Sequence, residues 1–134
     1  MIRQEKPILV VMGFKCKNFC AFNSYVNFVN RPEELRARQD LDRPLLELMV
    51  WTMHEQLNND RHFLFENPTT STVWHEQLLK RILNHPKTLV GTGNGCPYGL
   101  RGIRGGLLLK NWKWITTHPL LLEAVTRKCT GDHD

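Results

Sequence analysis

The stretch PILVVMG at residues 7–13 decides the fold class, because it is a short apolar and β-branched run that ends at a glycine. A run of this length without alternating polar residues is typical of a strand that is buried on both faces of a sheet. Such a strand needs helices on either side. Working outward from it, we expect further strands at residues 62–65, 88–90 and 112–117.

Helical patterns separate these expected strands. We predict helices at residues 31–41, 44–59, 74–83 and 119–127, with candidate N-caps for the third at residues 69–72. The helix at 44–59 carries two apolar rows and should pack against the sheet. One row is Leu46, Val50, Met53 and Leu57, and the other is Leu45, Leu48, Met49, Thr52 and Gln56. Alternating strands and helices predict an α/β fold built from parallel strands with right-handed crossovers.

Length and composition bound the possible functions. The chain has 134 residues, 41% of them hydrophobic, which suits one domain over residues 1–134. No stretch resembles a membrane span or a signal peptide, so we expect an intracellular protein without a membrane partner. Four cysteines are too few for a secreted disulfide scaffold. The net charge of +5 is compatible with a nucleic-acid partner.

Two short blocks at the ends of expected strands carry candidate catalytic residues. Cys16 follows the first strand between Lys15 and Lys17, and neighbouring cations favour the nucleophilic thiolate. Glu66 and Asn67 follow the next strand, and a carboxyl group beside apolar neighbours can act as a proton donor. In an open parallel sheet both blocks would lie at the ligand-binding edge.

Together with a third block, these residues resemble the catalytic domains of the cytosine-C5 DNA methyltransferases. That family carries a strand ending in Gly-Pro-Pro-Cys-Gln-x-Phe-Ser, a strand ending in Glu-Asn-Val, and then Tyr-Gly-Val-Pro-Gln-x-Arg-x-Arg. The similarity covers roughly residues 7 to 105, and similar segments occur in retroelement polyproteins. The matching positions are Cys16, Phe19, Glu66, Asn67, Tyr98, Gly99, Leu100 and Arg104.

The resemblance implies a fold and a set of roles. The fold would be a partial Rossmann-like methyltransferase sheet of three to four mostly parallel strands with helices on both faces. Residues 1–134 would form a single domain that resembles the catalytic-loop half of the family's fold. Cys16 would add to C6 of a flipped-out cytosine, Glu66 would hold and protonate N3, and Arg104 would anchor the base or its phosphate.

The sequence also departs from the family pattern. Residues that differ are Phe14 and Lys15 for Pro-Pro, Cys20 for Ser, Pro68 for Val, and Gly102 and Gly106 for Gln and the second Arg. The family's glycine motif for S-adenosylmethionine is absent, and the glycines at 91–95 are followed by an expected loop instead of a helix. We therefore expect a degenerate methyltransferase-like domain that is inactive alone and retains nucleic-acid binding. S-adenosylmethionine stays open as a cofactor, and a second chain or copy would complete the fold.

Several basic and polar residues are candidates for contacts with DNA or another nucleic acid. Aromatic and basic residues interleave at 110–114, a pattern that suits base stacking and phosphate contact. Arginines in the glycine-rich loop suit phosphate contact as well. The candidates are Lys15, Lys17, Asn67, Arg101 and Lys113.

A second interpretation belongs to another class, a non-catalytic module that binds nucleic acid or protein. Two short ligand pairs, Cys16-x3-Cys20 and Cys129-x3-His133, flank Cys96, and zinc binds thiolate and imidazole ligands. We assign no metal ligand among the site residues, but zinc is an open alternative. Its expected ligands are Cys96, Cys129 and His133.

Overall fold

The structure is a computed structural model that describes residues 2–133. The strands are β1 (Leu9–Gly13), β2 (His62–Pro68), β3 (Leu89–Asn94) and β4 (Asn111–Thr116). The α-helices are α1 (Ile2–Glu5), α2 (Pro32–Asn58), α3 (Gln77–Leu83) and α4 (Pro119–Val125). Short helical turns are η1 (Lys17–Phe19), η2 (Asn23–Asn27), η3 (Thr72–His75) and η4 (Cys96–Tyr98).

The four strands form one mixed sheet in the order β1-β2-β4-β3. Only β1 and β2 pair in parallel, whereas β4 is antiparallel to both β2 and β3. The α/β class and the four strands are therefore confirmed, but the prediction of a mostly parallel sheet was wrong. The reason is the connection from β3 to β4, which contains no crossover helix and so brings the chain back antiparallel.

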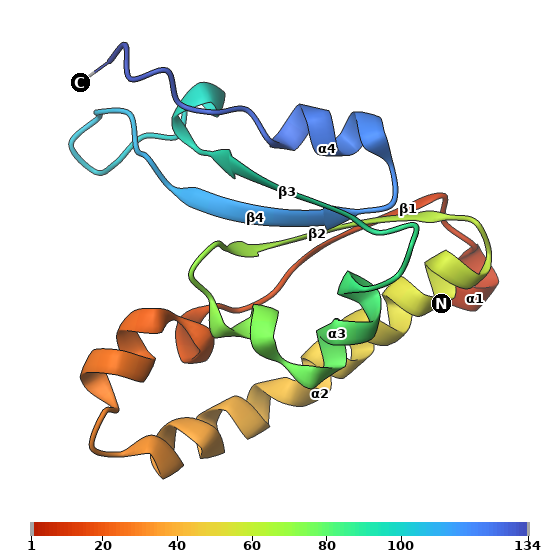
Figure 1. Cartoon of the computed structure of the whole chain (residues 1–134), viewed down its shortest axis with the longest axis horizontal. Coiled ribbons are helices and arrows are strands. Elements are labelled where there is room, and N and C mark those ends of the chain that lie inside the picture. The colour runs from red at the N-terminus through yellow and green to blue at the C-terminus, as the bar shows by residue number, and fades with distance from the viewer. Residues whose placement is uncertain (1, 134) are drawn as a thin grey trace.

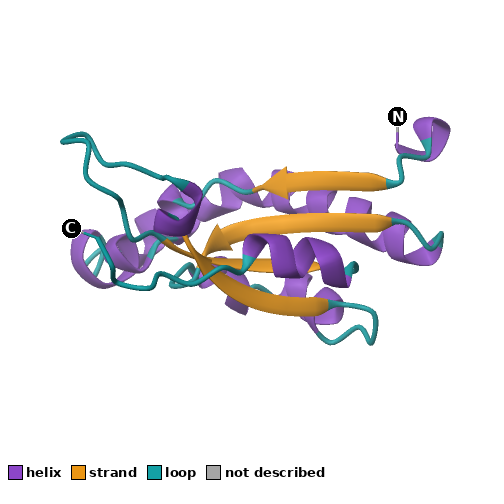
Figure 2. Ribbon diagram, turned by 90° about the horizontal axis from the view of Figure 1, so that it is seen from above, coloured by secondary structure: helices purple, strands orange, loops and turns teal. Residues whose placement is uncertain are grey.

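Helices lie on both sides of this sheet (Figures 1 and 2). The long α2 and the shorter α3 lie on one side, and α4 lies on the other, over β3 and β4. Ser71 caps η3, since its side chain accepts a hydrogen bond from the Val73 amide. The helix expected at 74–83 forms as α3 from Gln77, and its N-cap residue is Glu76, so the prediction of its N-cap at 69–72 was wrong. Helices on both faces are thus a confirmed part of the fold prediction.

The core lies between the sheet and α2. Phe63, Phe65 and Ile115 from the sheet pack with the apolar row of α2 that contains Leu46, Val50, Met53 and Leu57. The other predicted row divides, because Thr52 and Gln56 are buried whereas Leu45 and Leu48 are exposed. The helix is apolar over a wide arc, but only one row faces the sheet fully.

One continuous helix replaces the two that we expected at residues 31–41 and 44–59. Pro44 lies inside α2, where it removes the backbone hydrogen bond to residue 40. Asp40 is exposed, so water can satisfy its carbonyl group. The acidic Glu33 and Glu34 lie in the first turn, where they favour the helix dipole. The prediction of two separate helices was therefore wrong.

Strand β1 is an edge strand rather than a strand buried on both faces. Val11 is 63% exposed and Leu9 is 37% exposed, because α4 covers β3 and β4 but not this part of the sheet. On the other face, an apolar groove of about 570 Å³ runs between β1 and α2 and is lined by Met12, Leu48 and Trp51 among others. The outer edge of β1 pairs with no strand among residues 2–133.

Candidate functional site

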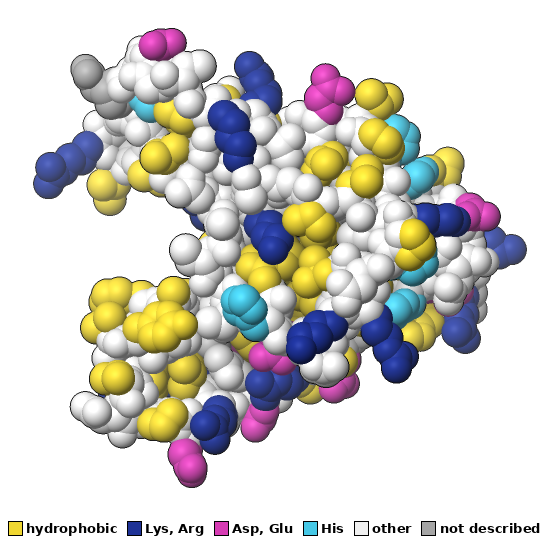
Figure 3. Space-filling model, viewed as in Figure 1, with side chains coloured by type: hydrophobic (Ala, Val, Ile, Leu, Met, Phe, Trp, Pro, Cys, Tyr) yellow, Lys and Arg dark blue, Asp and Glu magenta, His cyan; other side chains and the backbone are white. Residues whose placement is uncertain are grey.

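A notch opens at the carboxyl ends of β1 and β2 (Figure 3). One of its walls is formed by the loop between β3 and β4 with the carboxyl-terminal segment, and the other by η1, η2 and the start of α2. Exposed apolar residues of the segments that form these walls include Phe22, Tyr25 and Val26, in and next to η2, and Ile103 in the loop between β3 and β4. The predicted catalytic blocks lie at the carboxyl ends of these strands: Cys16 follows β1, whereas Glu66 and Asn67 lie within the last part of β2, which extends beyond the strand expected at residues 62–65.

The loop that carries Cys16 is fixed to the end of β2. Asn67 is fully buried and donates a hydrogen bond of 2.8 Å from Nδ2 to the Phe14 carbonyl oxygen. Further along, the Phe19 carbonyl accepts hydrogen bonds from the hydroxyls of Ser71 and Thr72. Cys16 is half-buried between these two anchors. The structure therefore holds the nucleophile candidate in an ordered loop.

Asn67 does not lie where a nucleic acid could contact its side chain. We predicted a nucleic-acid contact for it, but in this structure the amide is buried and bound to the protein backbone. Its role is to position the Cys16 loop. The reason is strand alternation, which turns Asn67 toward the α2 side of the sheet together with Phe65.

Glu66 points to the opposite face, and its surroundings favour the protonated carboxyl group. It pairs directly with Gly13 on β1 and Trp114 on β4, and directly paired residues share a sheet face. Burial raises the pKa of Glu66, and the charge of Lys110 opposes part of this effect. The Oε1 atom is buried without a hydrogen-bond partner in the described part of the chain. A raised pKa and an unpaired oxygen suit a proton donor.

Aromatic side chains lie next to Glu66 on the sheet face opposite α2. The rings of Trp112 and Trp114 lie 5.9 Å apart, and Tyr98 lies 5.8 Å from Trp112. Both indole N–H groups are buried and have no hydrogen-bond partner within residues 2–133. Sequence reasoning missed this link between Glu66 and the tryptophans. The alternation of β4 was its only signal, and the strand order was needed to use it.

The loop residues Arg101 and Arg104 are both exposed. Arg101 donates a hydrogen bond of 2.6 Å from Nη1 to the Gly105 carbonyl, which folds the loop back on itself. Arg104 lies in the same loop, which faces the η1 and η2 segment across the notch. The structure thus places the loop of Arg104 and the loop of Cys16 on facing walls.

The lysine candidates fall on different surfaces. Lys15 and Lys17 are exposed beside Cys16. Lys113 lies on the α2 side of the sheet, where its ammonium group is 4.8 Å from the centre of the Trp74 ring. Since Trp112 and Trp114 face the other side, the interleaved aromatic and basic residues at 110–114 do not form one continuous surface.

The glycines at 91–95 do not fit an S-adenosylmethionine site. They belong mostly to β3 and are followed by the short turn η4, not by the helix N-terminus that a cofactor glycine loop uses. Gly93 is required for packing, because a Cβ atom there would lie 2.3 Å from the Val125 carbonyl oxygen. Strand β3 extends through Asn94, beyond the strand expected at residues 88–90, and the segment after it forms η4 where we expected a loop.

A separate cluster of metal-ligand residues lies where the carboxyl-terminal segment meets η4. The ligand atoms of Cys96, Cys129 and His133 all lie within 4.8 Å of one another, close enough to hold a metal ion. A hydrogen bond with Cys96 lowers the pKa of Cys129, and burial raises the pKa of Cys96. Cys20 is not part of this cluster, because its sulfur bonds to the backbone of Lys17 and Asn23.

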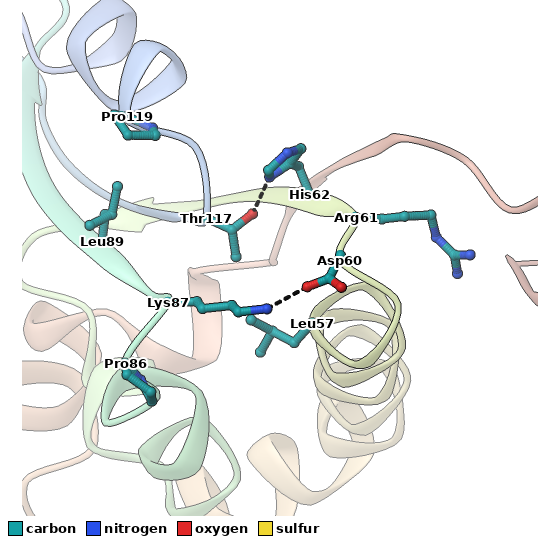
Figure 4. Close-up of a pocket in the computed structure, with 9 residues that line it drawn as sticks. All are labelled: Leu57, Asp60, Arg61, His62, Pro86, Lys87, Leu89, Thr117 and Pro119. Atoms are coloured by element: carbon teal, nitrogen blue, oxygen red, sulfur yellow. Dashed lines mark hydrogen bonds and ion pairs between the residues drawn. The ribbon is translucent and has the colours of Figure 1, made fainter.

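Another pocket, of about 410 Å³, lies at the amino-terminal end of β2, away from the notch (Figure 4). Lys87 reaches across it to pair with Asp60, while His62 bonds to the Thr117 hydroxyl at 2.8 Å. Arg61 points away from the cavity. The pocket contains none of the residues that the sequence predicted for the site.

Comparison with protein-family models, curated proteins and solved structures finds no match to this chain. Among the helices of residues 2–133, none combines the length and the apolar content that crossing a bilayer requires. The observed class is therefore a mixed α/β protein with a four-stranded sheet and a notch at the carboxyl ends of its parallel pair.

Proposed function

We propose that this protein is a degenerate cytosine-C5 DNA methyltransferase-like domain that binds nucleic acid at the notch and presents Cys16 and Glu66 to a cytosine. The observation that carries the proposal is the parallel pairing of β1 with β2, in which Gly13 lies directly opposite Glu66. This pairing brings the Cys16 loop and Glu66 to the same end of the sheet, although 49 residues lie between Cys16 and Glu66 in the sequence.

The chemistry of both residues supports this proposal. The Cys16 thiolate would form a bond to C6 while the electrons of the C5–C6 double bond move toward N3, which Glu66 protonates. Burial raises the pKa of Glu66, which is the direction of shift that suits a proton donor. Exposed Lys15, Lys17 and Arg104 would contact phosphates around the notch. Exposed aromatic side chains of the η2 segment, such as Tyr25, would stack on bases.

We derive no methyl-transfer step for this chain, because its glycines at 91–95 are not followed by the α-helix N-terminus that a cofactor glycine loop uses. The free edge of β1 supports a role for a second polypeptide, since an unpaired strand edge is a template for strand addition. The apolar groove beside it would be covered by the same partner. We propose that such a chain, or a second copy, extends the sheet into the Rossmann-like arrangement.

The test measures addition to cytosine without a methyl donor. After thiolate addition, the enamine takes a deuteron from D₂O at C5, loses the original C5 proton and expels the thiolate. No redox change occurs, and deuterium remains at C5. We expect exchange with single- or double-stranded oligonucleotides, loss of exchange in Cys16→Ser, and a decrease of about 100-fold or more in Glu66→Gln.

Two controls make the result specific. Cys20→Ser removes a cysteine of the same loop region and should keep the exchange. Fluorescence anisotropy with the same oligonucleotides measures binding separately from chemistry. Binding without exchange would support the alternative, a non-catalytic nucleic-acid module, and the absence of both would favour a protein interaction module.

A further inference from the structure

The carboxyl-terminal segment and η4 bring together three side chains that bind transition metals. Cys96 is buried at the start of η4, whereas Cys129 and His133 lie four residues apart in the final segment. The Sγ atom of Cys129 lies 3.1 Å from Nε2 of His133, and all three ligand atoms lie within 4.8 Å of one another. The fold thus brings Cys96 to two residues that lie 33 and 37 positions after it in the sequence.

Backbone contacts hold these two segments together independently of the cluster. The Asn94 amide donates to the Arg127 carbonyl at 3.0 Å, and the Cys129 amide donates to Oδ1 of Asn94 at 2.8 Å. The Tyr98 hydroxyl donates to the Ala124 carbonyl at 2.6 Å and accepts from the Arg127 amide at 3.0 Å. The fold therefore places the ligands before any metal binds, which reduces the entropy cost of binding.

We propose that Cys96, Cys129 and His133 bind one Zn²⁺ ion, with a water molecule as the fourth ligand. Tetrahedral zinc with usual bond lengths separates a sulfur and a nitrogen ligand by roughly 3.6 Å and two sulfurs by roughly 3.8 Å. The observed positions therefore need shifts of about 1 Å or less. Two thiolates would neutralise the charge of the ion.

The surroundings provide an entry path and an open coordination position. The cluster lines a pocket of about 220 Å³ together with Arg127 and Lys128. His133 is exposed and Cys129 is half-buried, so solvent reaches the ion from their side while buried Cys96 anchors it. Thiolate and imidazole ligands in this number select zinc over magnesium or calcium.

Zinc at this place would determine the shape of one wall of the notch. η4 leads directly into the loop with Arg101 and Arg104, and that loop returns to β4. Fixing the carboxyl-terminal segment to Cys96 would hold the base of this loop from two sides. This inference does not depend on the proposed function, because it concerns binding of a metal to residues outside the predicted catalytic set.

The test uses the full chain, purified under reducing conditions and stripped of metal with a chelator. Titration with Co²⁺ should give the absorption bands of tetrahedral thiolate coordination, and Zn²⁺ should abolish them at one equivalent. Loss of a residue that only hydrogen-bonds to a metal ligand already lowers metal affinity by about 10–100-fold. We therefore expect Cys129→Ser and His133→Asn, which remove ligands themselves, to weaken Zn²⁺ binding more than about 100-fold. Cys20→Ser and His75→Asn are matched controls and should bind as the unmodified chain does.

A second measurement keeps the proposal falsifiable if a variant unfolds. In the unmodified chain, Zn²⁺ should slow maleimide labelling of Cys96 and Cys129 but not of Cys16 and Cys20, as read by mass spectrometry. Equal labelling of all four cysteines with and without Zn²⁺, or absence of the tetrahedral Co²⁺ spectrum, would overturn the proposal. A Cys96–Cys129 disulfide in air, with no metal binding after reduction, would identify a redox pair instead.

Discussion

Substitution of Asn67 by alanine tests whether the end of β2 holds the Cys16 loop. The variant removes a 2.8 Å hydrogen bond and leaves the carbonyl group of buried Phe14 without its donor. An unsatisfied buried backbone group costs about 1–3 kcal/mol. Because Oδ1 of Asn67 has no partner in the described structure, its removal returns part of that cost. We expect a loss of about 2 kcal/mol in the free energy of unfolding.

The assay combines thermal unfolding with amide hydrogen exchange. For a domain of this size, a loss of about 2 kcal/mol lowers Tm by roughly 6–10 °C. Exchange should accelerate most in residues 14–20, because they lose their anchor to β2. Asn58→Ala is the control, since Asn58 is exposed near the end of α2, and it should change the free energy by less than about 0.5 kcal/mol.

Equal effects of the two substitutions would refute the reasoning, because they would show that the Asn67 contact carries no specific stability. The same conclusion would follow if Asn67→Ala destabilised the protein while residues 14–20 kept their protection from exchange. In that case the loop would be held by its other contacts, the hydrogen bonds from Ser71 and Thr72 at the start of η3 to the Phe19 carbonyl.

Three further substitutions test other features. Glu66 has a raised pKa in the folded protein, so its contribution to stability is greatest below its unfolded pKa and is lost as pH rises through the folded pKa. Glu66→Gln should therefore be more stable than the unmodified chain at neutral pH and equally stable in acid. Urea unfolding at several pH values measures this difference. Gly93→Ala places a Cβ atom against the α4 backbone and should cost about 2–3 kcal/mol in urea unfolding. Leu46→Ala empties a fully buried site and should cost about 2–5 kcal/mol in the same measurement.

Matched variants identify what each result means. Gly106→Ala adds a methyl group in open space and should be nearly neutral, so an equal loss there would disprove the packing argument for Gly93. Leu48→Ala lies on the exposed row of α2 and should cost much less than Leu46→Ala. Parallel pH curves for Glu66→Gln and the unmodified chain would show that burial does not shift the Glu66 titration.

Much of the secondary structure could be predicted from the sequence, because local patterns of apolar residues determine it. All four strands and the helices near residues 74–83 and 119–127 form close to their predicted positions. The row of Leu46, Val50, Met53 and Leu57 faces the core, as the helical spacing indicates. The helix prediction was wrong at Pro44, because the general rule that proline ends a helix does not hold there. Asp40 is exposed, so water can replace the helical hydrogen bond that its carbonyl group loses to Pro44.

The candidate site could also be predicted only in part from the sequence. From the sequence we expected Cys16 and Glu66 at strand ends, since each follows an apolar run. The sequence could not show that Asn67 is buried, nor that Glu66 and Trp114 are neighbours. Both facts depend on the strand order and on the sheet face toward which each side chain points. The sequence likewise left the zinc alternative open, since 32 residues lie between Cys96 and Cys129.

By itself, the sequence determined the α/β class of the fold, the approximate positions of its elements and the candidate catalytic and metal-binding residues. Only the tertiary structure decided the mixed sheet, the free edge of β1, the notch and the meeting of Cys96 with Cys129 and His133. The physical reason is that helix and strand patterns are read within a few residues. Strand order and ligand clusters, in contrast, arise from contacts between segments that are far apart in the chain.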